Sequence, residues 1–260
     1  MSSQQENTIL KPKVLEVKNV FRTYHHEDTN IVVLENVSFD IYEDEFVSLV
    51  GPSGCGKSTL LRIIVGLDRP TRGEVLYRGK KVEGVNPKTA LVFQNFALIP
   101  WLTVWQNVEL GLEARGIDKK EREKRIRYWL EKVGLDGHEN AYPRELSGGM
   151  KQRVGFARAL ALEPELLCMD EPFSSLDPLT SQNLREELLR LWGDKELPTV
   201  SILMVTHSIE EAIFMSDRVL IMSTHPGKII RDLRVELPRP RNMRDEEFQK
   251  IVDEVYTLIV

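Results

Sequence analysis

Cysteine is scarce in this sequence. Only two cysteines, Cys55 and Cys168, occur among its 260 residues. Cys55 lies inside a glycine-rich segment and Cys168 lies in an apolar run, so neither belongs to the spaced pattern of a disulfide framework. This scarcity excludes the small secreted proteins that disulfides hold together, and we expect the protein to work in a reduced, cytoplasmic setting.

An excess of positive charge is also missing. The 35 lysines and arginines are outnumbered by 40 aspartates and glutamates, which gives a formal net charge of −5 at pH 7. Because proteins that coat nucleic acid carry strongly basic surfaces, this balance argues against a nucleic-acid partner. The chain is long enough to bury a large core as one domain, or as one domain with an insert.

The sequence contains no clear secretion signal or membrane span. The N-terminus, MSSQQENTIL, is polar and lacks the basic-then-apolar profile of a signal peptide. The 20 residues Thr89–Val108 carry no charge and are about as long as a membrane span. However, they include Gln94, Asn95, Gln106 and Asn107, which a lipid-facing helix would leave unsatisfied. We therefore expect a strand, a loop and the start of a helix there.

Strand patterns and helix patterns alternate along most of the chain, which predicts an α/β fold. We expect strands at 14–20, 32–41, 45–50, 74–77, 90–93, 166–169 and 200–205. Helices are expected at 57–66, 117–133 and 151–161, and after Asp177. Thr103-x-x-Gln106 and Ser208-x-x-Glu211 have the pattern of capping boxes, and Pro226–Gly227 predicts a hairpin.

A glycine-rich loop, GPSGCGKST, follows the expected strand at 45–50 and opens the next helix. It fits the pattern G-x-x-x-x-G-K-[ST], in which backbone N–H groups surround phosphate oxygens at a helix N-terminus. Lys57 is expected to reach the β- and γ-phosphates, and the hydroxyl of Ser58 to bind Mg²⁺. A flexible glycine-rich turn is the alternative. The predicted nucleotide-binding residues are Gly51, Pro52, Ser53, Gly54, Cys55, Gly56, Lys57, Ser58 and Thr59.

Two adjacent carboxylates, Asp170 and Glu171, follow the expected strand at 166–169. Neighbouring side chains on a strand point to opposite faces, so we expect the two carboxylates to have different tasks. Asp170 is expected to hold the metal ion through water, and Glu171 to polarise the attacking water as a general base. An exposed acidic turn before Pro172 is the alternative.

A second candidate phosphate motif, LSGGM, occupies positions 146–150 and runs into the helix expected at 151–161. A serine and paired glycines at the start of a helix suit a phosphate group, because the helix N-terminus offers free N–H donors and a favourable potential. The two phosphate motifs cannot both serve the same nucleotide within one subunit.

The order and spacing of these motifs resemble those of the ATP-binding-cassette (ABC) ATPases over nearly the whole chain. The resemblance implies a P-loop NTPase core with an N-terminal antiparallel β subdomain and an inserted α-helical subdomain. It also implies a head-to-tail homodimer that holds Mg·ATP between its subunits. Within that dimer, the residues expected to contact the ATP of the opposing subunit are Ser147, Gly148, Gly149 and Asp177.

The same resemblance implies roles for three single residues. Gln94 is expected to touch Mg²⁺ and the water, His207 to contact the γ-phosphate, and Tyr24 to stack on adenine. From the residues alone, a solvated glutamine, a structural histidine and an edge-strand tyrosine are the alternatives. Two positions depart from the family pattern, Met150 in place of the commoner glutamine and Ser175 where alanine is frequent. Neither removes a phosphate ligand, so we expect activity to survive both.

Two further segments resemble the ATPases of nitrate, sulfonate and taurine importers. One is the apolar segment 96–108, FALIPWLTVWQNV, which resembles the surface where a permease docks; ordinary internal packing is the alternative. The other is the tail ELPRPRNMRDEEFQKIVDEVYTLI. The resemblance implies permease subunits, indirectly a solute-binding protein, and a peripheral location on the cytoplasmic face of the membrane. We expect no added regulatory domain of the kind found in sugar-importer ATPases.

We therefore expect one ABC nucleotide-binding domain over residues 11–260. Its core would span 11–95 and 161–240, its helical insert 96–160 and its tail helix 241–260. The expected function is ATP hydrolysis that energises the import of nitrate, sulfonate, taurine or a related small solute. The alternatives are the ATPase of an exporter or lipid-extracting system, and a soluble cluster-assembly ABC ATPase without a permease.

Overall fold

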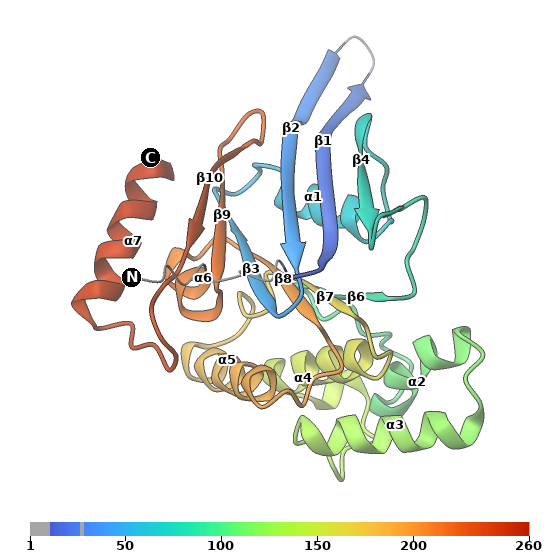
Figure 1. The fold of residues 1–260 in the computed structure, drawn as a ribbon. Coiled ribbons are helices and arrows are strands. Elements are labelled where there is room, and N and C mark those ends of the chain that lie inside the picture. The colour runs from blue at the N-terminus through green and yellow to red at the C-terminus, as the bar shows by residue number, and fades with distance from the viewer. Residues whose placement is uncertain (1–10, 27–28, 260) are drawn as a thin grey trace, which may run out of the picture.

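The centre of the protein is a six-stranded sheet with the strand order β10-β9-β3-β8-β7-β6 (Figure 1). The computed structural model describes residues 11–26 and 29–259. Neighbours β9, β3, β8, β7 and β6 are parallel, whereas β10 pairs with β9 in antiparallel fashion. The strands are β3 (Glu45–Val50), β6 (Thr89–Val92), β7 (Leu166–Asp170), β8 (Ser201–Thr206), β9 (Arg218–Met222) and β10 (Ile229–Arg234).

An antiparallel sheet of four strands covers one face of the central sheet. It has the order β2-β1-β4-β5 and consists of β2 (Thr29–Tyr42), β1 (Lys13–His26), β4 (Arg72–Tyr77) and β5 (Lys80–Lys81). Both β1 and β2 have 14 residues and run further than the sequence pattern predicts. Helix α1 (Lys57–Ile64) is buried between the two sheets. The antiparallel β subdomain expected at the N-terminus is confirmed.

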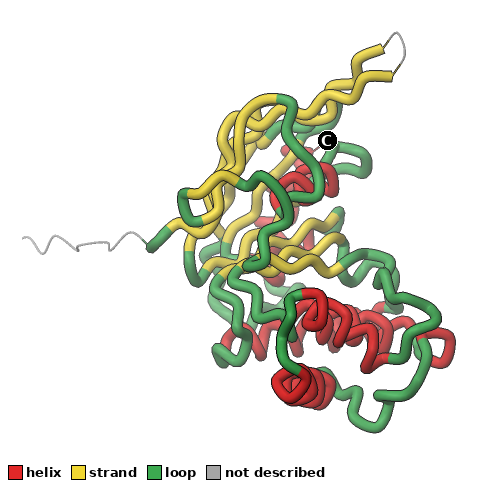
Figure 2. Tube along the Cα trace, turned by 90° about the vertical axis from the view of Figure 1, so that its right-hand side faces the viewer, coloured by secondary structure: helices red, strands yellow, loops and turns green. Residues whose placement is uncertain are grey.

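Helices cover the opposite face of the central sheet, which explains why its middle strands are apolar on both sides. Along β3, Val47 and Leu49 face the antiparallel sheet, whereas Phe46 packs on the opposite face, where its ring meets that of Trp192 in α5 (Pro178–Gly193). Between β6 and β7 lie α2 (Val104–Ala114), α3 (Lys119–Lys132) and α4 (Gly148–Leu160). Figure 2 shows these helices gathered at one end of the molecule, away from the antiparallel strands.

The first expected capping box is present at the start of α2. Thr103 Oγ1 accepts a hydrogen bond from the backbone N–H of Gln106, and the Gln106 side chain accepts one from the N–H of Thr103. Helix α4, in contrast, begins three residues before the expected start, because the hydroxyl of Ser147 caps it through the N–H of Met150. The paired glycines therefore form its first turn instead of preceding it.

The second expected capping box is only half formed. Helix α6 (Ile209–Met215) begins with Ser208, whose hydroxyl accepts a hydrogen bond from the N–H of Glu211. The carboxylate of Glu211 does not return to Ser208, because it is buried and pairs with Arg185 of α5 (Pro178–Gly193) at 3.6 Å. Burial raises the pKa of Glu211. A tertiary ion pair has replaced the local hydrogen bond that the sequence pattern predicts.

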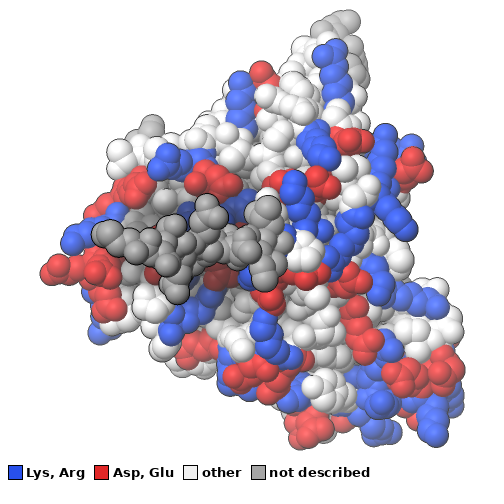
Figure 3. Space-filling view, in the orientation of Figure 1, with Lys and Arg blue, Asp and Glu red and all other residues white. Residues whose placement is uncertain are grey.

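The tail helix α7 (Glu246–Ile259) closes a third apolar cluster. Its residues Phe248, Val252 and Val255 pack against α6 and against Val219 and Ile221. Positive and negative side chains are interspersed over the face shown in Figure 3. Exposed ion pairs contribute about 0–1 kcal/mol each, so buried apolar contacts of this kind carry most of the stability. Among the described helices, none has the length and apolar character needed to cross a membrane.

We expect Phe248→Ala to lower the free energy of unfolding by about 3–5 kcal/mol, because it removes a buried ring from the cluster that joins α7 to α6. Tyr256→Ala serves as the matched control, since Tyr256 is 47% exposed on the same helix. Urea unfolding followed by circular dichroism measures both. Equal unfolding midpoints for the two variants would show that α7 is not part of the cooperative fold.

Candidate functional site

The glycine-rich loop connects the carboxyl end of β3 to the start of α1, as the sequence predicts. Gly54 and Gly56 have positive φ angles of 80° and 98°. At Gly56 a Cβ atom would lie 2.7 Å from Leu34 of β2, so both the backbone conformation and the available space require glycine. The Nζ of Lys57, which is buried, donates to the carbonyls of Gly51 at 2.7 Å and Pro52 at 3.0 Å.

The hairpin between β9 and β10 also supports this loop, which the sequence pattern does not indicate. A Cβ atom on Gly227 would lie 2.0 Å from the carbonyl oxygen of Cys55. The backbone of Gly227 bridges to Leu34 of β2 as well. The Pro226–Gly227 pair predicts a turn, but nothing in the local sequence places that turn against the phosphate loop.

The hydroxyl of Ser58 donates a hydrogen bond to Asp170 Oδ1 at 2.9 Å. Burial raises the pKa of Asp170, the hydrogen bond from Ser58 opposes this, and the nearby charge of Glu171 adds to the increase. Magnesium binds hard oxygen ligands, usually one or two protein groups completed by phosphate oxygens. Ser58 and Asp170 supply such a pair. In the described part of the chain, no cluster of three or more His, Cys, Asp or Glu forms a metal site made of protein alone.

Three side chains from three neighbouring strands meet beside Asp170. Gln94 follows β6, Glu171 follows β7 and His207 follows β8. Glu171 Oε2 accepts a hydrogen bond from Gln94 Nε2 at 3.2 Å and lies 3.0 Å from His207 Nδ1. Because the carboxyl ends of parallel strands share one edge of a sheet, residues that are distant in sequence converge there. The structure thus brings together the three predicted catalytic residues.

Strand alternation predicts that the side chains of Asp170 and Glu171 point in different directions, and this explanation is wrong for Glu171. This residue has a φ of 45° and has already left the strand, which ends at Asp170. Its backbone N–H still donates to the carbonyl of Val205 on β8 at 2.8 Å. The side chains of Asp170 and Glu171 do diverge, but they do so because the chain turns through a left-handed residue. Left-handed backbone is uncommon for a residue with a side chain and is often found at functional sites.

Ser174 and Ser175 connect Gln94 to the loop after β7. They belong to the segment SSLD (174–177), which resembles the loop that crosses the dimer interface in ABC ATPases, and that resemblance does not predict these hydrogen bonds. The hydroxyl of Ser174 donates to the carbonyl of Glu171 at 3.0 Å and accepts from Gln94 Nε2 at 3.3 Å. The hydroxyl of Ser175 donates to the carbonyl of Gln94 at 3.3 Å. The replacement of the common alanine by serine at 175 was the available signal. Ser175 adds a hydrogen bond to Gln94 that alanine could not make, and the survival of activity with serine at this position stays a prediction.

The remaining predicted residues lie in two other places. Ser147, Gly148 and Gly149 open α4, and Asp177 caps α5 by accepting from the N–H of Thr180 at 3.0 Å. A Cβ atom on Gly149 would lie 2.5 Å from the side chain of Thr180, so these two helix starts pack closely. Within residues 11–26 and 29–259, no hydrogen bond joins this group to the phosphate loop.

Tyr24 lies on β1, which pairs with β2, and its side chain is 39% exposed. Its hydroxyl donates to Asp68 Oδ2 at 3.1 Å, and the guanidinium of Arg22 lies 4.4 Å from the centre of its ring. The structure therefore places an accessible aromatic ring on the antiparallel sheet, and a stacking role for it stays a prediction.

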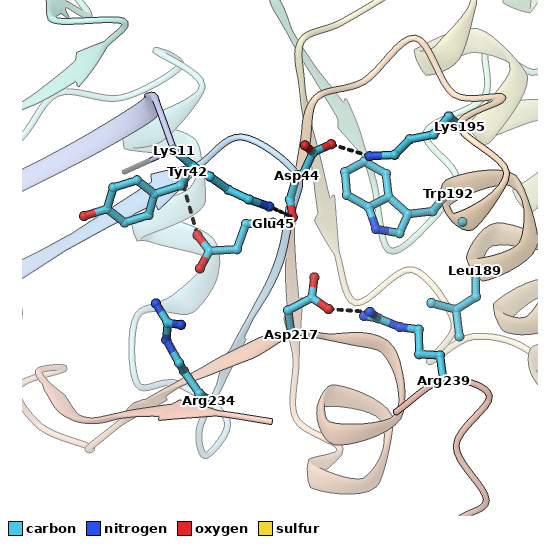
Figure 4. Close-up of a pocket in the computed structure, with 11 residues that line it drawn as sticks. Lys11, Tyr42, Asp44, Glu45, Leu189, Trp192, Lys195, Asp217, Arg234 and Arg239 are labelled. Atoms are coloured by element: carbon cyan, nitrogen blue, oxygen red, sulfur yellow. Dashed lines mark hydrogen bonds and ion pairs between the residues drawn. The ribbon is translucent and has the colours of Figure 1, made fainter. Parts of the chain in front are cut away.

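A cavity of about 620 Å³ is separate from this site (Figure 4). It is lined by Glu45, the first residue of β3, and so lies at the amino ends of the parallel strands. Figure 4 shows that Asp44 pairs with Lys195 and that Asp217 pairs with Arg239. The phosphate loop and the three converging side chains are at the opposite edge of the sheet.

Comparison with known proteins identifies relatives of this chain among ATP-binding proteins. A protein-family model described as ABC transporter matches residues 34–174. The nitrate import ATP-binding protein NrtD of Synechocystis sp. is 45% identical over 254 residues, which cover 94% of this chain and 94% of that protein. The chain belongs to the ABC transporter family of ATP-binding proteins. The aliphatic sulfonates import ATP-binding protein SsuB of Bacillus cereus is 43% identical over 235 residues, covering 90% of this chain and 91% of that protein.

Solved structures of ABC cassettes share the fold. One is the dimeric ATP-binding cassette MJ0796 in a post-hydrolysis state bound to ADP and Pi, with a TM-score of 0.75 and 36% identity. It covers 86% of this chain and 100% of the other. The expected architecture of an ABC ATPase is therefore confirmed, and ATP binding is a property of this family. That ATP binds at the glycine-rich loop of this chain stays a prediction.

The raised pKa of Asp170 makes a prediction about stability. Because the pKa of Asp170 is higher in the folded protein than in the unfolded chain, ionisation of this carboxyl group lowers the stability of the fold as the pH rises above its usual value of 3.8. We expect Asp170→Asn to raise the unfolding temperature of the nucleotide-free protein at pH 7, and the gain to shrink as the pH falls towards 3.8.

Asp177→Asn is the control for this measurement. A hydrogen bond from Thr180 lowers the pKa of Asp177, and asparagine caps a helix about as well as aspartate, so no gain is expected. Thermal unfolding over a range of pH compares the two variants. A lower unfolding temperature for Asp170→Asn at pH 7 would contradict the account.

Proposed function

We propose that this ABC protein hydrolyses ATP to drive the import of a small solute through a separate membrane permease. The convergence of Gln94, Glu171 and His207 beside the phosphate loop is the observation that carries the hydrolytic part. The import part rests on relatives that are named for nitrate import and for import of aliphatic sulfonates. Nitrate, a sulfonate, taurine or a related small solute is the proposed cargo.

In the proposed reaction the phosphate loop holds the β- and γ-phosphates of ATP, with Lys57 released from its own backbone to reach them. Ser58, Asp170 and Gln94 would hold Mg²⁺, which neutralises phosphate charge when bound. Glu171 accepts a proton from the attacking water, and His207 supports the γ-phosphate from the adjacent strand. Gln94, which already contacts Glu171, places the water between the base and the phosphate.

Two copies are proposed to close head to tail, so that each nucleotide lies between the phosphate loop of one subunit and Ser147–Gly149 of the other. The dimeric form of the MJ0796 cassette supports this arrangement. The packing of Gly149 on Thr180 supports it too, because it places the segment LSGGM (146–150), which we call the signature motif, beside Asp177. Hydrolysis then lets the two subunits separate.

The permease is proposed to dock on the segment 96–108 of this subunit, on the cytoplasmic face of the membrane. Large apolar side chains that lie exposed together often mark a site where another protein binds. Trp101 is 74% exposed. Leu98 and Trp105 next to it are only partly buried against the core, so the segment both packs inward and offers an apolar surface. A solute-binding protein would deliver the cargo to the permease from the other side.

We expect Glu171→Gln to bind ATP, to dimerise and to lose turnover by about 100-fold or more, because a general base typically contributes that much. Lys57→Ala is the matched comparison and is expected to lose nucleotide affinity instead. Phosphate release and equilibrium binding of ATP measure the two effects. Turnover close to that of the parent protein in Glu171→Gln would remove Glu171 from the role of base.

The import proposal is tested by affinity purification from detergent-solubilised membranes. We expect a multi-span permease to be recovered with this subunit and lost with Trp101→Ala, since a central aromatic side chain often carries about 2 kcal/mol or more of an interface. Ile230→Ala, another exposed apolar position at 45%, should leave recovery unchanged. If only soluble partners are recovered, the proposal that the protein hydrolyses ATP would stand, and the proposal that it drives transport through a permease would be rejected.

A further inference from the structure

Two consecutive residues directly after the catalytic region adopt a conformation that side chains disfavour. Phe96 and Ala97 have φ values of 63° and 45°, and we call this pair the elbow. Neither is glycine, and a residue with a Cβ atom has a higher conformational energy in left-handed backbone than glycine has. The elbow lies between Gln94, which contacts Glu171, and the segment that carries Trp101. A strained pair at this point needs an interaction that holds it in place.

Arg158 of helix α4 supplies that interaction. Its guanidinium donates to the carbonyl of Phe96 at 2.8 Å and to the carbonyl of Ala97 at 2.6 Å. Among the side chains that the structure describes, no carboxylate pairs with it, and burial lowers the pKa of Arg158. A planar fork fits two neighbouring carbonyls in a way that a lysine ammonium does not. Burying a charge against carbonyls alone is costly, so stability by itself is a poor reason for this arrangement.

Helix α4 carries a second buried donor, the side-chain amide of Gln152, which makes no hydrogen bond among the described residues. Gln152 is 0% exposed, and both polar atoms of its side chain are without a hydrogen-bond partner among the described residues. A Cβ atom on Gly155 would lie 3.9 Å from Gln152 Oε1 and 3.9 Å from the carbonyl oxygen of Phe96. Gly155 is three residues from both Gln152 and Arg158, so it neighbours each of them on the helix surface, and it faces the carbonyl of Phe96. Gln152 is therefore a buried donor without a partner among the described residues, close to the part of α4 that contacts the elbow.

The segment beyond the elbow is tied into one unit by Asn107, which is 1% exposed. Its Nδ2 donates to the carbonyls of Ile99 at 3.2 Å, Leu102 at 3.1 Å and Thr103 at 2.9 Å. Its Oδ1 accepts from the N–H of Ile99 at 2.8 Å. A displacement of the elbow is thus passed to Trp101 without being absorbed by a loose loop.

We propose that Arg158 is a positioning residue that couples the signature helix α4 to the surface around Trp101 by holding the elbow. The inference rests on the proposed closing of two subunits around ATP. Ser147 caps helix α4, so a force on the first turn of the helix during closing reaches Arg158 near its other end. The guanidinium then moves the two carbonyls of the elbow, and the segment that Asn107 ties together follows.

The test uses full-length protein that carries Glu171→Gln, so that ATP is retained. Dimer formation on adding Mg·ATP is measured by light scattering. The environment of Trp101 is measured by its fluorescence, taken as the difference from the same protein with Trp101→Phe. We expect ATP to change this emission, and Arg158→Lys and Arg158→Met to dimerise normally while losing the change.

Two further variants separate coupling from folding. Ala97→Gly relieves the backbone strain, so Arg158→Met combined with Ala97→Gly should fold, bind ATP and dimerise, still without the change in Trp101 emission. Ala97→Gly alone should retain the change, because Arg158 still holds both carbonyls. Arg153→Lys is the matched control on the same helix, since Arg153 contacts the carbonyl of Val133 at 2.7 Å and Glu187 but not the elbow.

The outcomes of these measurements are distinct. A full ATP-induced change in the Arg158→Met and Ala97→Gly double variant would overturn the inference. Loss of dimerisation in the Arg158 variants would overturn it as well, because Arg158 would then act in closing itself. A parent protein that dimerises with no change in Trp101 emission would also overturn it. Failure of the parent to bind ATP or to dimerise would instead reject the proposed function on which the inference rests.

Discussion

The site depends on one constraint, which is that β3, β6, β7 and β8 run parallel and end at the same edge of a sheet. A parallel sheet places the residue after each strand beside the residue after the next. The phosphate loop after β3, Gln94 after β6, Glu171 after β7 and His207 after β8 all follow from that arrangement. Without it, Glu171 would be an isolated acid; with it, the acid lies within hydrogen-bond distance of two polar side chains.

The rest of the molecule holds this edge and connects it to other surfaces. The antiparallel sheet buttresses the phosphate loop through Leu34, and the β9–β10 hairpin does so through Gly227. Ser174 and Ser175 tie the loop after β7 to the loop after β6. Among the connections that would carry a movement are hydrogen bonds to backbone carbonyls, from Ser175 to Gln94 and from Arg158 to Phe96 and Ala97. Such bonds have well-defined geometry, which suits them to hold a loop in one position or another.

The sequence predicted those parts of the site whose chemistry is local. The phosphate loop is contiguous, and its spacing follows from how a strand, a tight turn and a helix N-terminus meet. Asp170 and the cap at Thr103 were predictable for the same reason. The start of α4 and the partner of Glu211 were not, because Ser147 caps earlier than the apolar pattern indicates and Arg185 comes from another helix. The left-handed turn at Glu171 depends on its contact with Val205, which lies on a different strand.

The hydrogen bonds of Ser174 and Ser175 to Gln94 could not be predicted from the sequence either, because Gln94 lies about 80 positions earlier. No window of sequence contains both ends of such a contact. The family resemblance named Gln94 and His207, and the structure supplied their common partner, Glu171. The physical reason that they lie together is therefore tertiary, and the strand order provides it.

We propose that Glu171 and His207 act as one unit in hydrolysis, and a double-mutant cycle measures the coupling between the two side chains. ATP turnover is compared for the parent protein, Glu171→Gln, His207→Ala and the double variant. Residues that act as a unit are strongly non-additive, so the account predicts that the double variant is about as slow as the slower single variant. Multiplicative losses would show that the two side chains act independently and would contradict the account.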